Sequence, residues 1–284
     1  MSWRINRYNK KSSKQLGWHP NWFGPFLEDF DNELIIEVKR FQHQHEIKSD
    51  GMVGSQTFRR ILTSRDDNVK QKNHILVNGI NLPIDWDVKI DLFKPSCYRQ
   101  VKYDRKPKMI VTHWDVTTSA DKCRRVLEAR NISTHFCIDN DGVIHQYVDT
   151  NNIAWHAKGA NNHSIGIDFS NAYYLKYQNK YKKMGLTERP VCLDSRVHGV
   201  KLKPHLGYYP IQIEAYKKLI KTLCEYYDIP LDYPADKDGN LLTRVHKDSV
   251  KKRFKGIVCH YHLTRNKIDC AGLDIRAILD EVEN

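Results

Sequence analysis

The chain has 284 residues, with 46 lysines and arginines against 34 aspartates and glutamates, which gives a formal net charge of +12. A chain of this length can bury a hydrophobic core without disulfide bonds, and its seven dispersed cysteines, with no Cys-x-x-Cys pair, argue against a disulfide framework and indicate a reducing compartment. No run of 18 apolar residues occurs, and no apolar segment follows the basic N-terminal residues, so we expect neither a membrane-spanning helix nor an export signal.

The positive charge favours an acidic partner, and the charge alone does not choose between nucleic acid, an anionic membrane face and an anionic wall polymer. Basic residues are interspersed along the whole chain, and the sequence contains no recognisable nucleic-acid-binding motif. We therefore expect no nucleic-acid partner.

The first predicted elements are helical. Apolar residues recur at helical spacing over residues 31–45, and Ser55 can cap a second short helix. The turn-rich segment 48–54 connects the two helices. Polar residues and short extended pieces follow, which predict a linker over residues 69–100. The chain thus divides into a helical domain over 1–68, this linker and a larger domain over 101–284.

The larger domain has an α/β pattern. Strands are predicted over 108–113, 134–138, 143–148 and 164–169, and helices over 123–130, 210–227 and around 275–279. The second and third strands flank Asp-Asn-Asp-Gly at 139–142, which is typical of a hairpin turn. We predict a central mixed β-sheet flanked by helices. A polar, tyrosine-rich stretch over 173–209 interrupts the pattern; its lysines and Arg189 suit an anionic glycan-peptide, or it is an ordinary surface insertion.

One short segment concentrates groups that can bind a metal or act in catalysis. Residues 259–272 contain His260, His262, Lys267, Asp269 and Cys270. A third imidazole, His113, ends a predicted strand, where open sheets place their ligand sites. Because a hydrolytic zinc site needs three protein ligands and one open position, these residues are candidates for such a site, with more possible ligands than it needs.

The order of several motifs resembles a known family. The segments are Ile110-Val111-Thr112-His113-Trp114, then 132–142, 154–157, 162–168 and 260–272. They are similar to the zinc-dependent N-acetylmuramoyl-L-alanine amidases of phage lysozymes, wall-recycling amidases and peptidoglycan recognition proteins. The Phe-Gln pair at 41–42 and the Asp-Gly-Met-Val-Gly run at 50–54 resemble the three-helix peptidoglycan-binding domain of wall hydrolases. The resemblance implies a zinc amidase with an N-terminal wall-binding module.

The resemblance also implies a ligand set for Zn²⁺. His113 matches the first ligand and His260 the second, while Asp269 matches the third, two residues after the family's catalytic lysine. Cys270 stands where the family usually has proline, and its thiol would also satisfy zinc. His262 could replace His260 if the loop register differed, so both alternatives remain open at this point.

Catalytic and substrate-binding residues follow from the same resemblance. Asp168 stands where recycling amidases carry a glutamate and is expected to act as general base, and Lys267 to stabilise the oxyanion. Thr134 occupies the position of a catalytic tyrosine in some phage members. His156 matches a pocket histidine and, with Trp155 and Thr134, is expected to contact substrate; a structural role for His156 is the alternative.

The implied activity is zinc-dependent cleavage of the amide bond between the lactyl group of N-acetylmuramic acid and L-alanine. We expect a monomeric phage endolysin that acts on bacterial peptidoglycan, possesses bacteriolytic activity and contacts anionic wall or outer-membrane surfaces. It would wait in the host cytoplasm until a pore-forming partner releases it. The alternatives are a non-catalytic peptidoglycan-recognition protein and a cytosolic wall-recycling amidase.

Overall fold

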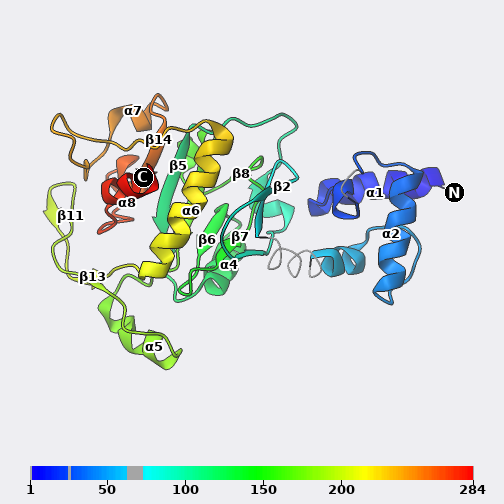
Figure 1. The fold of residues 1–284 in the computed structure, drawn as a ribbon, viewed down its shortest axis with the longest axis horizontal. Coiled ribbons are helices and arrows are strands. Elements are labelled where there is room, and N and C mark those ends of the chain that lie inside the picture. The colour runs from blue at the N-terminus through cyan, green and yellow to red at the C-terminus, as the bar shows by residue number, and fades with distance from the viewer. Residues whose placement is uncertain (1, 25–26, 63–72, 284) are drawn as a thin grey trace.

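The computed structural model describes residues 2–24, 27–62 and 73–283 and is built around a six-stranded sheet (Figure 1). The strand order is β14-β5-β9-β6-β7-β3. The strands are β3 (Val88–Ile90), β5 (Met109–Trp114), β6 (Phe136–Ile138), β7 (Ile144–Gln146), β9 (Ser164–Phe169) and β14 (Gly256–Cys259). Neighbouring strands are parallel except β6 and β7, which form the predicted hairpin. The mixed central sheet is confirmed.

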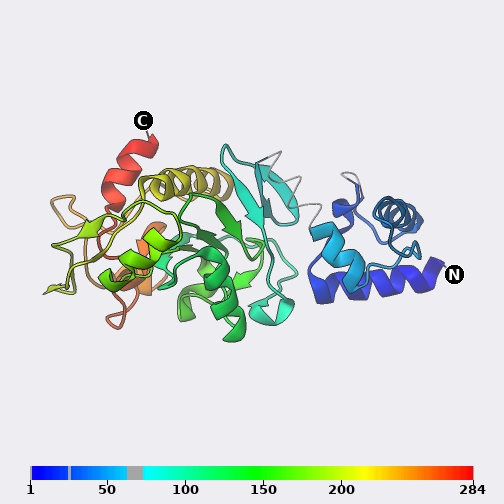
Figure 2. The same ribbon diagram turned by 90° about the horizontal axis from the view of Figure 1, so that it is seen from below.

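Helices cover the two faces of the sheet. Figure 2 shows the yellow α6 (Pro210–Tyr227) on one face, with α8 (Ile275–Glu283) beside it. The opposite face is partly covered by α4 (Ala120–Ala129), whose Cys123 packs with Cys137 and Tyr147. The face under α6 holds most of the apolar core. The face under α4 is left with room for polar side chains.

The turn between β6 and β7 needs its glycine. Gly142 has a φ of +86°, a conformation that side chains with a Cβ rarely adopt. A Cβ there would also lie 2.7 Å from Cγ1 of Ile211 at the start of α6. The hairpin is thus packed directly against the helix that covers the sheet.

The described part of segment 69–100, expected to be a linker, belongs to the sheet domain instead. β1 (His74–Val77) and β2 (Ile80–Pro83) form an antiparallel hairpin, and β3 joins β7 at the sheet edge. β4 (Tyr98–Arg99) pairs with β8 (Ile153–Ala154). The prediction was wrong because strands of two to four residues are too short to show an alternating sequence pattern. Their assignment to the sheet domain depends on partners that lie far away in the sequence. Residues 69–72 of that expected linker lie outside the described residues.

The N-terminal region is helical, as expected. It contains α1 (Ser2–Leu16), α2 (Asn32–Gln44) and a helix over 55–62. Gln42 organises the connection after α2: its amide nitrogen donates to the carbonyl of Met52 and the hydroxyl of Thr57, each at 3.0 Å, and its oxygen accepts from the backbone of Gly51 at 2.8 Å. The Phe-Gln motif therefore has a structural purpose.

The 173–209 stretch forms small elements outside the sheet. They are α5 (Gln178–Lys183) and two short antiparallel pairs, β10 (Val191–Cys192) with β13 (His205–Leu206) and β11 (Arg196–Val197) with β12 (Val200–Lys201). Arg189 is buried and donates to the carbonyls of Gly207 and Ser170, each at 2.8 Å. It anchors the insertion and is not available to an anionic ligand. None of the described helices is both long and apolar enough to cross a membrane.

Candidate metal centre and active site

Three predicted ligands meet at the carboxyl ends of two neighbouring strands. β5 carries His113, and β14, which pairs with β5, leads directly into His260. The loop after His260 returns Asp269 to the same point. Nδ1 of His113 lies 3.0 Å from Nδ1 of His260, and each nitrogen lies 3.1 Å from Oδ2 of Asp269. Three ligand atoms thus converge on one buried point.

The protonation states of this group suit a metal. Burial lowers the pKa of His113 to about 4, helped by the neighbouring His260 and opposed by Asp269. Burial by itself would raise the pKa of Asp269, but the close contacts of its carboxylate with His113 and His260 outweigh burial and hold the pKa well below its usual range. At neutral pH His113 is therefore neutral and Asp269 ionised, which are the forms that coordinate zinc.

Behind His113 runs a chain of hydrogen bonds that fixes its ring. Nε2 of His113 lies 3.0 Å from Nδ1 of His156, and Nε2 of His156 lies 3.3 Å from Oγ of Ser164. That hydroxyl donates to the carbonyl of Ala160 at 2.9 Å. Because Nδ1 of His113 faces the other candidate ligands, Nε2 carries the proton and donates to Nδ1 of His156. Nε2 of His156 then donates to the hydroxyl of Ser164.

Gly166 on β9 leaves the space that the ring of His156 occupies in this series of hydrogen bonds. A Cβ at Gly166 would lie 2.7 Å from Cγ of His156 and 2.9 Å from the hydroxyl of Thr134. His156, expected to contact substrate, therefore packs between the strand and the candidate ligand His113. The residue as a whole is half-buried, which is compatible with both roles.

Asp168 lies next to the metal centre. On β9 it pairs with His113 of β5, and side chains at paired positions of parallel strands project from the same face. Burial raises the pKa of Asp168 well above its ordinary value, with a further contribution from the carboxylate of Asp115, while the hydroxyl of Thr134 lowers it. Asp168 is buried, with 8% of its surface exposed.

Two of the predicted site residues, Lys267 and Trp155, are exposed to solvent. Lys267 is exposed in the loop between His260 and Asp269, and its backbone carbonyl lies 2.9 Å from Nε2 of His198. Its charge makes a small contribution that lowers the pKa of both Asp168 and His113. The side chain of Trp155 is 37% exposed.

The two alternative ligands point elsewhere. Nδ1 of His262 accepts from the backbone of Cys259 at 2.9 Å, and Nε2 lies 2.5 Å from the carbonyl of Leu242, so both ring nitrogens are occupied. Sγ of Cys270 contacts Sγ of Cys259 at 3.2 Å and is not part of the three-atom group. The geometry therefore favours Asp269 as the third ligand.

Two residues of the site region, the buried Arg105 and the half-buried Asp115, were missed by sequence reasoning. Arg105 donates to the carbonyls of Thr150 and Asn152, each at 2.8 Å, and so holds the segment that leads to Trp155. Asp115, two residues after His113, has its pKa raised to about 6 by burial. The position of Asp115 at a strand end was a usable signal, whereas nothing in the sequence around Arg105 marked it.

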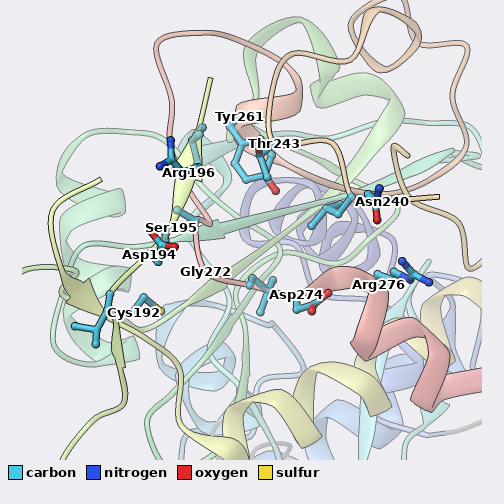
Figure 3. A pocket seen from close by; sticks show the side chains of 15 residues that line it. Cys192, Asp194, Ser195, Arg196, Asn240, Thr243, Tyr261, Gly272, Asp274 and Arg276 are labelled. Carbon is cyan, nitrogen blue, oxygen red and sulfur yellow. The ribbon is translucent and has the colours of Figure 1, made fainter. Parts of the chain in front are cut away.

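A separate cavity of about 420 Å³ lies beside the loop that connects His260 to Asp269 (Figure 3). It is lined by residues 192–197 of the insertion, by 240, 241 and 243, by Tyr261, and by 271–274 and 276. The three candidate ligands and the predicted catalytic residues do not line it. The cavity is therefore distinct from the centre formed by His113, His260 and Asp269.

The chain is similar to a family of known proteins and to several solved structures. A family model described as N-acetylmuramoyl-L-alanine amidase matches residues 103–269. Among solved structures, the chain is similar to the N-acetylmuramoyl-L-alanine amidase LysC from Clostridium intestinale URNW, with 15% identity, a TM-score of 0.42, and 69% of this chain and 97% of that chain covered. For the amidase AmiD from E. coli the identity is 22% and the TM-score 0.32, with 47% and 49% covered. No curated protein sequence matches the chain.

Proposed function

Since the chain belongs to the N-acetylmuramoyl-L-alanine amidase family, we propose that it hydrolyses the amide bond between the lactyl group of N-acetylmuramic acid and L-alanine in a zinc-dependent reaction. The observation that carries this proposal is the convergence of His113, His260 and Asp269, whose ligand atoms lie 3.0 to 3.1 Å apart. Peptidoglycan is the corresponding substrate.

The donor set fits zinc. Tetrahedral ligands about 2.0–2.1 Å from zinc lie about 3.3 Å from one another, close to the separations in this group. Two imidazoles and one carboxylate leave a fourth position open, as in catalytic rather than structural sites. A zinc ion held by His113, His260 and Asp269 would lower the pKa of a water molecule to about 7 and polarise the scissile carbonyl.

Asp168 is suited to moving the proton. Its buried carboxyl group, with a raised pKa, can accept a proton from the attacking water and pass it to the departing amine of L-alanine. Lys267, on the exposed loop, can approach the carbonyl oxygen and stabilise the negative charge that develops there. Trp155 and His156 flank this site and are candidates for positioning the sugar-peptide junction.

The biological setting we propose is a phage endolysin. The helical region over 1–68 would hold the cell wall, and the enzyme would remain in the host cytoplasm until a pore-forming partner released it. A cytosolic recycling amidase would have little use for a wall-holding module. A recognition protein without activity is disfavoured because the ligands, Asp168 and Lys267 are all present.

The decisive experiment measures the release of new L-alanine amino termini from purified peptidoglycan. We expect release by the native enzyme, loss of activity with a chelator and recovery with added zinc. Full activity after chelation would refute the zinc mechanism. Comparing intact wall with a soluble muramoyl-peptide tests the setting, since faster cleavage of the soluble compound would favour the recycling role.

A further inference from the structure

Helix α1 gathers its positive charge on one side. It contains five cations, Arg4, Arg7, Lys10, Lys11 and Lys14, and no acidic residue. At about 100° per residue, these five side chains fall within an arc of about 120° around the helix. All five are exposed. The helix therefore presents a continuous basic face, defined here by these five residues.

This basic face is not neutralised by the rest of the protein. Among the described residues, none of the five cations forms an ion pair. Trp3 lies within the same arc and is 66% exposed, with the guanidinium of Arg7 5.4 Å from the centre of its ring. A large exposed indole among unpaired cations is a combination suited to a ligand that is anionic and partly apolar.

The opposite side of α1 fixes the orientation of the basic face. Asn9 donates to the carbonyl of Gly51 and accepts from the backbone of Val53, each at 2.9 Å. Ser12 donates to the carbonyl of Val53 and accepts from the indole of Trp18 at 3.1 Å. Because these polar groups are buried and paired, the helix cannot rotate the cations inward without breaking the bonds.

The position of α1 leaves room for a large partner. Figures 1 and 2 show the N-terminal end of α1 at the end of the molecule away from the six-stranded sheet, which carries the candidate metal centre. A surface bound to α1 would therefore leave the candidate active site open.

We propose that the basic face of α1 docks the enzyme on an anionic phospholipid surface. The choice of lipid rests on the proposed function, which places the enzyme in the bacterial envelope. Cations that reach the headgroup phosphates contribute about 1 kcal/mol each, or about fivefold in partitioning. Trp3 is placed to enter the headgroup layer, where indole rings concentrate. Duplex nucleic acid would use the cations but gives the indole no equivalent environment.

The test is binding of the full chain to vesicles. Vesicles of phosphatidylcholine with phosphatidylglycerol would be compared by sedimentation with vesicles of phosphatidylcholine alone. We expect binding to the anionic vesicles only, weakening as salt is added. Replacing Arg7, Lys10 and Lys14 together by glutamine, a good helix former, should reduce partitioning about a hundredfold, and Trp3→Phe should remove part of the blue shift in fluorescence on binding.

A matched control removes three exposed cations from α5. The variant with Lys180, Lys182 and Lys183 replaced by glutamine loses the same charge and should lose less than fivefold. Equal losses in both variants, or equal binding to neutral vesicles, would overturn the proposal. So would a triple α1 variant that loses binding to duplex DNA but keeps binding to vesicles. Cleavage of a soluble muramoyl-peptide, measured separately on the unmodified chain, tests the proposed function without lipid.

Discussion

The contact between His113 and His156 allows a quantitative prediction. Replacing His156 with alanine removes the acceptor that lies 3.0 Å from Nε2 of His113. The buried N–H is then left without its partner, at a cost of about 1–3 kcal/mol. Partners of this kind typically change metal affinity by about 10- to 100-fold. We expect the zinc affinity of His156→Ala to fall by about this factor.

Asparagine provides the matched comparison. Oδ1 of an asparagine at position 156 can occupy the place of the imidazole Nδ1 and accept the hydrogen bond from His113. His156→Asn should therefore bind zinc more tightly than His156→Ala. Ser164→Ala removes the hydroxyl that contacts His156, one hydrogen bond further from His113. The zinc affinity of this variant should fall less than tenfold.

Zinc affinity is measured by competition with a chromogenic chelator, and unfolding is followed separately on the metal-free proteins to account for lost stability. A folded His156→Ala protein with zinc affinity within twofold of the native value would refute the reasoning. If His156 instead acts only on substrate, its replacement raises KM and leaves zinc affinity unchanged. The two roles are therefore distinguished by one pair of measurements.

Three further predictions concern the metal, the base and pH. Asp269→Ala should abolish stoichiometric zinc binding while Cys270→Ser retains it, as measured by metal analysis of the purified proteins; the reverse result would make the thiol the ligand. Asp168→Asn should lower kcat by about 10²- to 10⁴-fold with bound zinc unchanged, and a kcat near the native value would exclude Asp168 as the base. Burial lowers the pKa of His145 to about 4, below its value of about 6.5 in the unfolded chain. Between these two pH values the unfolded chain binds more protons than the folded protein. The free energy of unfolding therefore falls as the pH decreases from about 6.5 to about 4. Denaturant unfolding at about pH 7 and about pH 4.5 should show that His145→Gln reduces this loss by about 2 kcal/mol, and an unchanged loss would contradict the assignment.

Much of the fold could be predicted because the longest elements carry strong local signals. α6 was expected over the range it occupies, since Pro210 suits the first helical turn and apolar residues recur behind it. β9 was likewise expected over its observed range. β14 and β3 were missed because strands of three or four residues, paired only through tertiary contacts, produce no period in the sequence. The sheet domain consequently begins earlier in the chain than the composition indicated.

The sequence predicted which segments form the site but not which way their side chains point. The strand ending at His113 and the resemblance around His260 identified the elements, but not whether Asp269 or Cys270 faces the histidines. That choice depends on the path of the loop, which directs the thiol of Cys270 toward Cys259. The contact of His156 with His113 depends in turn on the space left by Gly166. Both contacts are long-range packing outcomes and have no local signature.

The register of three strands places Asp168, the proposed base, in an environment different from that of Asp269, the proposed metal ligand. His113 on β5, Asp168 on β9 and Cys137 on β6 are paired across the sheet and share one face. Asp168 therefore has a candidate metal ligand, His113, on one side and the buried thiol of Cys137 on the other, and burial raises its pKa. Asp269, whose Oδ2 lies 3.1 Å from Nδ1 of each of two imidazoles, has its pKa lowered instead. Opposite environments thus separate the pKa values of two nearby aspartates, which suits one to proton transfer and the other to metal binding.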